Sequence, residues 1–317
     1  MFRSVIKKVL NLGDILVFTK NFCYAKLRFL LKTDSKIIQD YFSNNKVRKL
    51  NIGGGLFRIK KLANSLYRQA IIIKHIRLKS YIKYSIKSKN GLALVEINNF
   101  PVFVRKGTPD IDVAISCLNG EFEALEFLYG KDFDGVIVDA GGYIGTAAIA
   151  LNHIFPQAKI ITIEPSSENM EVLKRNVEDI KKIQTIFGAL ISADDKKISL
   201  MDRGTGEWGY TVVRNPQDKE DAKVICETPS VNLSSLGVAV EEIGILKLDI
   251  EGGEYDLFIN DSVSLLKIPN IIVELHDRII NGCSEEFFKF SKDRIVIKTA
   301  SEKFLSISKS VCNPPKN

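Results

Sequence analysis

The sequence predicts an α/β protein built on a Rossmann-like, mostly parallel sheet, and three apolar strands indicate this fold. Residues 136–145 (VIVDAGGYIG) are an apolar strand that runs into a glycine turn. Residues 158–164 form a second apolar strand, which ends in an acid, and residues 245–254 (ILKLDIEGGE) form a third, which ends in several carboxylates. Continuously apolar strands are typical of parallel sheets that are covered on both faces.

The glycine turn after the first strand predicts a ligand-binding loop. Gly141, Gly142 and Gly145 follow Asp139, and residues 146–155 continue with helical periodicity. Glycines permit positive φ and let a ligand approach the main chain, and the helix beyond them presents free N–H groups. Many α/β proteins also turn tightly after a strand without binding a cofactor, so the next strand has to support the interpretation.

The second strand supplies that support and favours one cofactor. Glu164 ends this strand 25 residues after Asp139, and an acid in this position holds ribose hydroxyls in such folds. The glycine spacing differs from G-x-G-x-x-G, whose second glycine admits the pyrophosphate of NAD. S-adenosylmethionine has no phosphate and fits better. The residues that we assign to it are Asp139, Gly141, Gly142, Tyr143, Gly145, Glu164 and Ala189.

The remaining elements follow from periodicity and turn residues. We expect a hairpin at 92–105, a helix at 121–129, a third core strand at 183–189, added strands at 197–201, 209–213 and 223–226, a helix at 284–291, and a closing antiparallel hairpin from strands 294–299 and 304–308. The added strands belong to an insertion, residues 191–235, that holds the only tryptophan, Trp208. Loops over the carboxyl ends of strands bind substrates, so Trp208 either stacks on a substrate ring or is a hydrophobic anchor.

Charge divides the chain into two regions. Residues 1–90 carry 21 Lys and Arg against 3 Asp and Glu, a net charge of +18, whereas the remaining residues carry −11. We therefore expect a basic, helical N-terminal region at 1–90 and a catalytic domain at 91–317, with its core at 133–310. Apolar residues interleave with the basic ones in 1–32, as in an interfacial helix. Contact with an anionic membrane or a lipid-linked glycan, a cap on the catalytic domain, and nucleic-acid binding are the three interpretations of this region.

Composition bears on the compartment. Five cysteines are scattered without disulfide or metal spacing, which favours a reducing compartment. No signal peptide or membrane span is expected, because the apolar stretches near the N-terminus are short and broken by lysine. We expect a cytoplasmic protein, membrane-peripheral if residues 1–90 bind lipid. Residues 49–55 (KLNIGGG) look like a second glycine loop, but no acid-ending strand follows them, so a structural turn is expected.

Six blocks of sequence, in order, resemble the FkbM-type family of S-adenosylmethionine-dependent methyltransferases. The blocks are 103–110 with Gly120-Glu121, 138–145, 163–165 with Asn169 and Asn176, 230–233, 246–254 and 272–276. The resemblance implies a class I methyltransferase fold, with a mostly parallel seven-stranded sheet and a closing antiparallel hairpin. It also implies, together with the basic and apolar N-terminus, a saccharide or glycosylated acceptor that is methylated on a hydroxyl. The chain departs from the family at Gly142-Tyr143, where Ala-Asn is usual, and at Asn232, where Asp is usual.

Methyl transfer to a hydroxyl needs a group that removes a proton, and carboxylates at the ends of the fourth and fifth core strands, in residues 245–254 and 272–276, offer candidates. The catalytic assignments are His276, Asp249 and Glu251, with Glu254 and Glu274 nearby. His276 is attractive as a base because an ordinary histidine titrates near neutrality. The alternative is that His276 packs against the sheet and Glu254 caps a helix.

Three further hypotheses remain open at this point. Carboxylates with a histidine also suit a divalent cation, although we assign no metal ligand. Nucleic-acid methylation is disfavoured, because residues 249–252 (DIEG) stand where base amino-methyltransferases carry an Asn/Asp-Pro-Pro-aromatic loop. A degenerate, membrane-associated scaffold without cofactor binding is the non-enzymatic alternative.

Overall fold

A computed structural model of the chain describes residues 49–52, 55–58, 83–89, 92–118, 121–193, 197–213, 222–299 and 303–309. The chain divides into two compact units, residues 1–81 and 82–317. In the first unit, strands β1 (Lys49–Ile52) and β2 (Gly55–Arg58) pair antiparallel. The described residues of the segment 49–55 therefore belong to an antiparallel strand pair and not to a strand–turn–helix unit. The helix expected within residues 1–32 lies outside the described residues.

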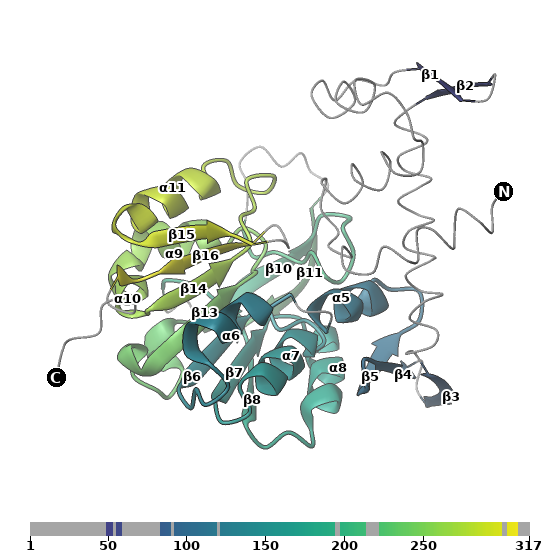
Figure 1. The fold of residues 1–317 in the computed structure, drawn as a ribbon, viewed down its shortest axis with the longest axis horizontal. Coiled ribbons are helices and arrows are strands. Elements are labelled where there is room, and N and C mark those ends of the chain that lie inside the picture. Colours follow the sequence, from purple (N-terminus) through teal and green to yellow (C-terminus); the bar gives the residue numbers. More distant parts are fainter. Residues whose placement is uncertain are drawn as a thin grey trace. The chain divides into compact units, whose positions relative to one another are not determined.

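The second unit contains a seven-stranded sheet with the order β15-β16-β14-β13-β6-β7-β8 (Figure 1). The strands are β6 (Val136–Ala140), β7 (Lys159–Glu164), β8 (Ile183–Phe187), β13 (Ile243–Leu248), β14 (Asn270–Val273), β15 (Ile295–Lys298) and β16 (Phe304–Ile307). The central strands pair in parallel, and β16 runs antiparallel to both of its neighbours. This order, with a reversed strand inserted next to the edge, is the class I methyltransferase fold and confirms the predicted fold class.

Helices cover both faces of this sheet. The helices among the described residues of this unit are α5 (Asp110–Cys117), α6 (Glu123–Tyr129), α7 (Thr146–Ile154), α8 (Ser167–Val177), α9 (Glu254–Asn260), α10 (Ser262–Lys267) and α11 (Cys283–Phe290), with 3₁₀ turns η1 (Leu233–Ser235), η2 (Val240–Glu242) and η3 (Ser291–Asp293). The chain moves along the sheet one way from β6 to β8 and the other way from β13 to β14. Right-handed crossovers therefore place α7 and α8 on one face and α9 to α11 on the other (Figure 1).

The core explains why the strands read as continuous apolar runs. Val138, Ile161, Leu246 and Ile271, one from each of the four central parallel strands, are fully buried. Charged side chains are also buried in these strands: Lys247, near the end of β13, is 3% exposed, and Asp139 in β6 is 0% exposed.

The described residues of this unit also form three smaller sheets. They pair β3 (Lys83–Lys89) with β4 (Leu92–Ile97) and β5 (Phe100–Arg105), β9 (Ala189–Leu190) with β12 (Ser230–Val231), and β10 (Ile198–Asp202) with β11 (Lys223–Thr228). The hairpin predicted at 92–105 is confirmed, and its turn residues Asn98 and Asn99 both have positive φ. The closing hairpin of β15 and β16 is confirmed as well.

Two sequence-based expectations about strands are corrected. The third core strand ends at Phe187, because Ala189 and Leu190 leave the main sheet and pair with β12. Residues 209–213 do not form a strand, since only Thr211 bridges to Met201.

Asn232, which stands where the FkbM pattern usually has Asp, keeps a capping role. Its side chain accepts from the N–H of Ser235 at 3.0 Å and caps η1.

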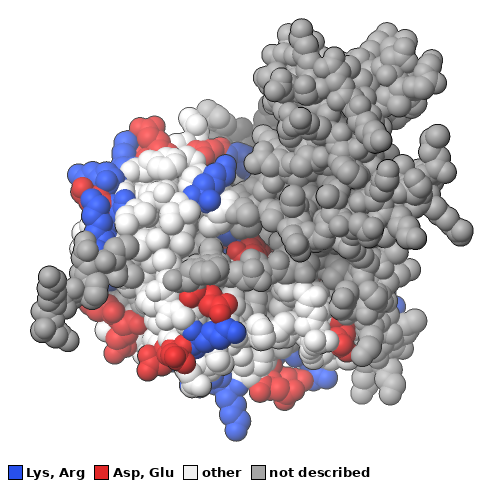
Figure 2. All heavy atoms as spheres, viewed as in Figure 1, with Lys and Arg blue, Asp and Glu red and all other residues white. Residues whose placement is uncertain are grey.

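The surface of the described part carries charges of both signs. Figure 2 shows lysines and arginines interspersed with aspartates and glutamates over the described residues of the face that it presents. Within the described ranges, we find no helix with the length and apolar character needed to span a bilayer.

Candidate active site

A cavity that is open to solvent lies at the carboxyl ends of β6, β7, β13 and β14. The sheet reverses its strand order between β6 and β13, and open α/β sheets bind ligands at such a switch point. Of the residues assigned from sequence, those that line the cavity are Gly141, Gly142, Tyr143, Glu164, Ala189, Asp249 and Glu251. Asp139, Gly145 and His276 are not among the lining residues.

The glycine turn follows β6 and forms one wall. Gly141 has a φ of 79°, and a Cβ there would lie 1.8 Å from the backbone oxygen of Asp249. The N–H groups of Gly141 and Gly142 both donate to the carbonyl of Ile163, at 3.0 and 2.9 Å. Gly145 has a φ of 86° and is the N-cap residue of α7. Gly141 is therefore required by the close approach of the next strand end, and Gly145 by the turn into the helix.

Gly142 and Tyr143 stand where the FkbM pattern usually has Ala-Asn, and packing explains the glycine. A Cβ on Gly142 would lie 2.3 Å from Thr162 Oγ1 and 2.8 Å from Leu173 Cδ1, so the alanine usual in the family has no room. Tyr143 has a φ of 50°, a conformation that asparagine adopts more readily than bulky residues. Its hydroxyl donates to Asp110 Oδ1 at 2.5 Å.

Asp110 is held from two sides. Arg105 donates through Nε at 3.0 Å and Nη2 at 2.8 Å, and its backbone N–H also donates to Asp110, at 2.7 Å. Burial alone would raise the pKa of Asp110, but the hydrogen bonds from Arg105 and Tyr143 lower it below its usual value. Burial and the neighbouring carboxylate raise the pKa of Tyr143. The hydroxyl of Tyr143 is thus a neutral donor to a charged acceptor, a contact that sequence reasoning missed.

Glu164 ends β7 and points into the cavity wall. Its Oε2 accepts the N–H of Tyr143 at 2.8 Å, while Oε1 accepts from Ser166 N and Asn169 Nδ2, both at 3.0 Å. Burial raises the pKa of Glu164 to about 7, although these hydrogen bonds favour the ionised form. The carboxylate is therefore oriented by protein donors and retains acceptor capacity toward the cavity.

A direct contact between Asp139 and a cofactor is not supported by the structure. Asp139 is 0% exposed, accepts from Thr162 Oγ1 at 2.9 Å, and lies 3.0 Å from Lys247 Nζ. The two residues are paired across β6 and β13. Lys247 also donates to the carbonyls of Ala140 and Gly141, at 3.2 and 2.7 Å. Asp139 therefore acts behind the cavity, by holding the lysine that fixes the glycine turn.

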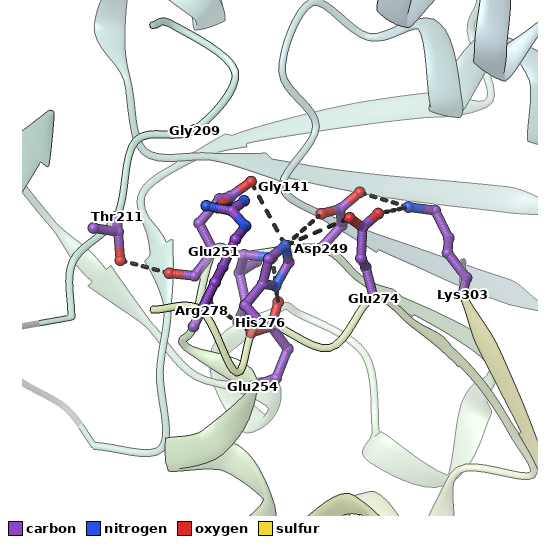
Figure 3. Close-up of polar contacts among 12 residues, drawn as sticks. Gly141, Gly209, Thr211, Asp249, Glu251, Glu254, Glu274, His276, Arg278 and Lys303 are labelled. Carbon is purple, nitrogen blue, oxygen red and sulfur yellow. Dashed lines mark hydrogen bonds and ion pairs between the residues drawn. The ribbon is translucent and has the colours of Figure 1, made fainter. Parts of the chain in front are cut away.

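Carboxylates converge at the opposite wall (Figure 3). Asp249 and Glu251 come directly after β13, and Glu274 and His276 come directly after β14. The Nε2 atom of His276 lies 3.7 Å from Asp249 Oδ1, 3.6 Å from Glu251 Oε1 and 3.8 Å from Glu274 Oε1. The four side chains predicted to meet at adjacent strand ends are thus brought together.

His276 lies beneath this wall and not on it. The residue is 1% exposed, and its Nδ1 atom is 3.0 Å from Glu254 Oε1. Burial lowers the pKa of His276, but the charges of Glu254, Asp249 and Glu251 outweigh burial and raise it to about 9. A direct role as the base that contacts an acceptor, expected from its ordinary pKa, is therefore not what the structure shows.

Glu254 holds the turn that precedes α9. Its carboxylate accepts from the N–H groups of Ile250 and Gly252, at 2.7 and 2.8 Å. It does not cap the helix, because the N-cap residue is Gly253 and no side chain bonds to the first turn. It also orients the imidazole of His276. Both functions come from one fully buried side chain.

Lys303, immediately before β16, supplies a positive charge to the carboxylates of this wall. Its Nζ lies 2.8 Å from Asp249 Oδ2, 2.5 Å from Glu274 Oε2 and 3.3 Å from Glu121 Oε1. Burial would lower the pKa of Lys303, but the three acids raise it well above its usual value. Burial would also raise the pKa of Asp249, but Lys303 and Lys247 lower it.

Glu251 connects this wall to the insertion. Arg278 Nη2 donates to Glu251 Oε2 at 2.7 Å, and Thr211 Oγ1 donates to its backbone oxygen at 2.6 Å. Burial raises the pKa of Glu251 to about 7. The guanidinium carbon of Arg278 lies 5.8 Å from the centre of the Trp208 ring, within cation–π range. Trp208 lines the cavity and is 42% exposed.

Comparison with known proteins shows which family domain the motifs match. Residues 139–291 match the methyltransferase FkbM domain, which confirms the resemblance seen in the sequence blocks. The chain is 26% identical over 164 residues to "Methyltransferase 1" of Beauveria bassiana, an alignment that covers 45% of this chain and 66% of the relative.

Solved structures give weaker likenesses. The methyltransferase FkbM of Methylobacillus flagellatus is 12% identical with a TM-score of 0.37, over 55% of this chain and 43% of that one. TYW2 of M. jannaschii, in complex with AdoMet, is 9% identical with a TM-score of 0.36, over 71% and 90%. The matched part of this chain thus corresponds to less than half of the FkbM structure.

Proposed function

Because residues 139–291 form a methyltransferase FkbM domain, we propose that the protein is an S-adenosylmethionine-dependent methyltransferase that methylates a saccharide hydroxyl. One observation carries the proposal: the glycine turn with Glu164 and the carboxylates Asp249 and Glu251 line the same cavity. S-adenosylmethionine supplies an electrophilic methyl group when bound. The residues of this chain have to hold the cofactor, orient the acceptor and take up its proton.

The cofactor half of the cavity suits a nucleoside without phosphate. Glu164 Oε2 accepts one N–H bond, and a carboxylate oxygen has capacity for a second, so ribose hydroxyls can donate to it. Gly141 and Gly142 present no Cβ to the cavity, and Ala189 presents only a methyl group. These features support the fit of an adenosyl cofactor at the ends of β6 and β7.

The acceptor half suits a hydroxyl compound. Transfer requires the acceptor oxygen to be held near the methyl group and to lose its proton. Asp249 and Glu251 line the cavity and can accept a hydroxyl proton, whereas His276 lies behind them. Trp208 offers an exposed aromatic face at the same cavity, on which a saccharide ring can stack. The basic, apolar region 1–90 further favours an acceptor at an anionic membrane on its cytoplasmic side.

Calorimetric titration with S-adenosylhomocysteine, beside NADH, tests the cofactor. We expect micromolar binding of S-adenosylhomocysteine alone. Glu164→Gln should weaken it about tenfold or more, the equivalent of roughly 1.4 kcal/mol. Glu168→Gln is the matched control, since Glu168 is exposed on α8 and does not line the cavity. Absence of binding would reject the proposal in favour of a scaffold, and equal effects of both variants would reject the site.

Transfer of a labelled methyl group to glycosides, lipid-linked saccharides and RNA tests the acceptor. We expect methylation of a saccharide hydroxyl, with Trp208→Ala raising KM for that acceptor and leaving kcat nearly unchanged. Labelling of RNA with no saccharide labelled would contradict the acceptor class while leaving the cofactor assignment intact.

A further inference from the structure

The imidazole of His276 presents a buried nitrogen that forms no hydrogen bond with the described part of the chain, although three carboxylates lie within ion-pair distance. The His276 side chain is 2% exposed, and its Nε2 atom has no hydrogen-bond partner among the described residues. The other ring nitrogen, Nδ1, is held by Glu254 at 3.0 Å. Buried polar atoms normally have a partner, so the orientation imposed by Glu254 leaves Nε2 available for a ligand.

Three carboxylate oxygens surround Nε2 at distances that no hydrogen bond accounts for. Asp249 Oδ1, Glu251 Oε1 and Glu274 Oε1 lie 3.7, 3.6 and 3.8 Å from it, beyond the range of N–H···O bonds. Two ligands that each sit about 2.1 Å from one cation are themselves about 3.0–3.6 Å apart at ordinary coordination angles. The observed spacing is close to that of ligands around a common centre.

The second oxygen of each carboxylate is already occupied by a basic residue. Lys303 contacts Asp249 Oδ2 at 2.8 Å and Glu274 Oε2 at 2.5 Å, and Arg278 contacts Glu251 Oε2 at 2.7 Å. The bases therefore hold the outer oxygens and leave the inner ones directed at His276 (Figure 3). A histidine oriented by a carboxylate through its other nitrogen is the usual arrangement around a bound metal ion.

We propose that Asp249, Glu274 and His276 bind a divalent metal cation at the carboxyl edge of β13 and β14. Their ligand atoms all lie within 4.8 Å of one another. Two carboxylates with one imidazole suit a cation such as Mn²⁺, between the hard ions that prefer oxygen alone and the softer ions that prefer nitrogen. Asp249 and Glu274 also line the cavity, so the cation would have open positions facing an acceptor.

The chemical role of this cation rests on the proposed function, whereas its binding does not. A divalent cation at the acceptor end would bind the hydroxyl oxygen and lower the pKa of the hydroxyl. Glu251, whose Oε1 faces the same point, would then be placed to take the proton. Lys303 would keep the two carboxylate ligands in position.

Titration of the full chain with MnCl₂, followed by the EPR signal of free Mn²⁺ without cofactor or acceptor, tests the site. Asp249→Asn and Glu274→Gln each remove one ligand charge and keep the shape of the side chain. Glu121→Gln is the matched control, because it removes the same charge from the same lysine, 3.3 Å from Lys303 Nζ, and lies outside the ligand set. Both ligand variants should weaken Mn²⁺ binding about 10- to 100-fold, and the control should stay close to wild type.

Two results would overturn the proposal. One is the absence of Mn²⁺ binding by the wild-type protein up to about 1 mM, the weak limit of biological divalent-ion sites. The other is equal weakening by Glu121→Gln and the two ligand variants, which would indicate attraction to general negative charge. Thermal unfolding of each variant confirms that it is folded. Binding of S-adenosylhomocysteine is measured separately, so its failure would count against the proposed function and leave the Mn²⁺ result standing.

Discussion

Replacing Tyr143 by phenylalanine isolates one contact made by a residue that departs from the usual FkbM sequence pattern. The substitution removes the hydroxyl that donates to Asp110 Oδ1 at 2.5 Å and keeps the ring, which is 8% exposed. Hydrogen bonds to charged groups contribute about 1.5–3 kcal/mol. Asp110 keeps its two side-chain bonds from Arg105 in the variant. The free energy of unfolding should therefore fall by about 2 kcal/mol, near the lower end of this range.

Denaturant unfolding at neutral pH measures this loss, and thermal unfolding should show it as a decrease in Tm of about 4–8 °C for a domain of this size. The backbone N–H of Tyr143 still reaches Glu164 in the variant, so the affinity for S-adenosylhomocysteine should not change. This control separates a stabilising role of the hydroxyl from a cofactor contact.

The pH dependence of the loss provides a second check. Asp110 has a lowered pKa in the folded protein, so its contribution to stability is present above its ordinary pKa of 3.8 and is lost as the pH falls through the lower folded value. The difference between wild type and Tyr143→Phe should therefore be constant near neutrality and narrow below about pH 4. Equal denaturant midpoints at neutral pH, or a difference that widens in acid, would refute the argument.

Three further substitutions test the turn, the cofactor acid and the buried pair. Gly142→Ala should cost about 1–3 kcal/mol of unfolding free energy by overpacking, and less in a Thr162→Ala background, because Thr162 Oγ1 is the closest obstacle. Because burial raises the pKa of Glu164 to about 7, S-adenosylhomocysteine affinity by calorimetry should rise between about pH 6 and pH 8 as the carboxylate ionises, and should be flat in Glu164→Gln. Lys247→Met should lower the free energy of unfolding by about 3–5 kcal/mol, because it leaves Asp139 buried without its counter-ion. Denaturant unfolding should show that the double variant Lys247→Met, Asp139→Asn regains part of this free energy.

The sequence predicts the sheet well because its strands are long apolar runs that end in turn residues. Adjacent parallel strands bring their carboxyl ends to one edge, and this rule alone is enough to expect Asp249, Glu251, Glu274 and His276 together. The rule predicts at which edge of the sheet these side chains lie, but it does not predict which of them line the cavity and which are buried behind it. Asp249 lines the cavity and His276 lies behind it, a difference set by how the loops after β13 and β14 fold back.

Asp139 shows where strand-level reasoning fails. An acid at the end of the first strand has the same sequence context whether it faces a cofactor or a buried lysine. The informative signal was the partner, since Lys247 stands alone within the apolar run 245–248 (ILKL). A lysine in the interior of a buried strand needs an opposing charge, and the parallel register of β6 and β13 supplies Asp139.

Lys303 follows from the reversed direction of β16. The parallel strands deliver their carboxyl ends to the cavity edge, whereas an antiparallel strand inserted among them delivers its amino end to that edge. Lys303 stands immediately before Phe304, the first residue of β16, and β14 pairs with β16 so that Val273 lies opposite Phe304. The residue before β16 must therefore meet the residue after β14, which is Glu274, and the two side chains are 2.5 Å apart. In this fold, the position before the reversed strand is thus a site position, and a lysine there is matched to the acids that the parallel strands bring to the same edge.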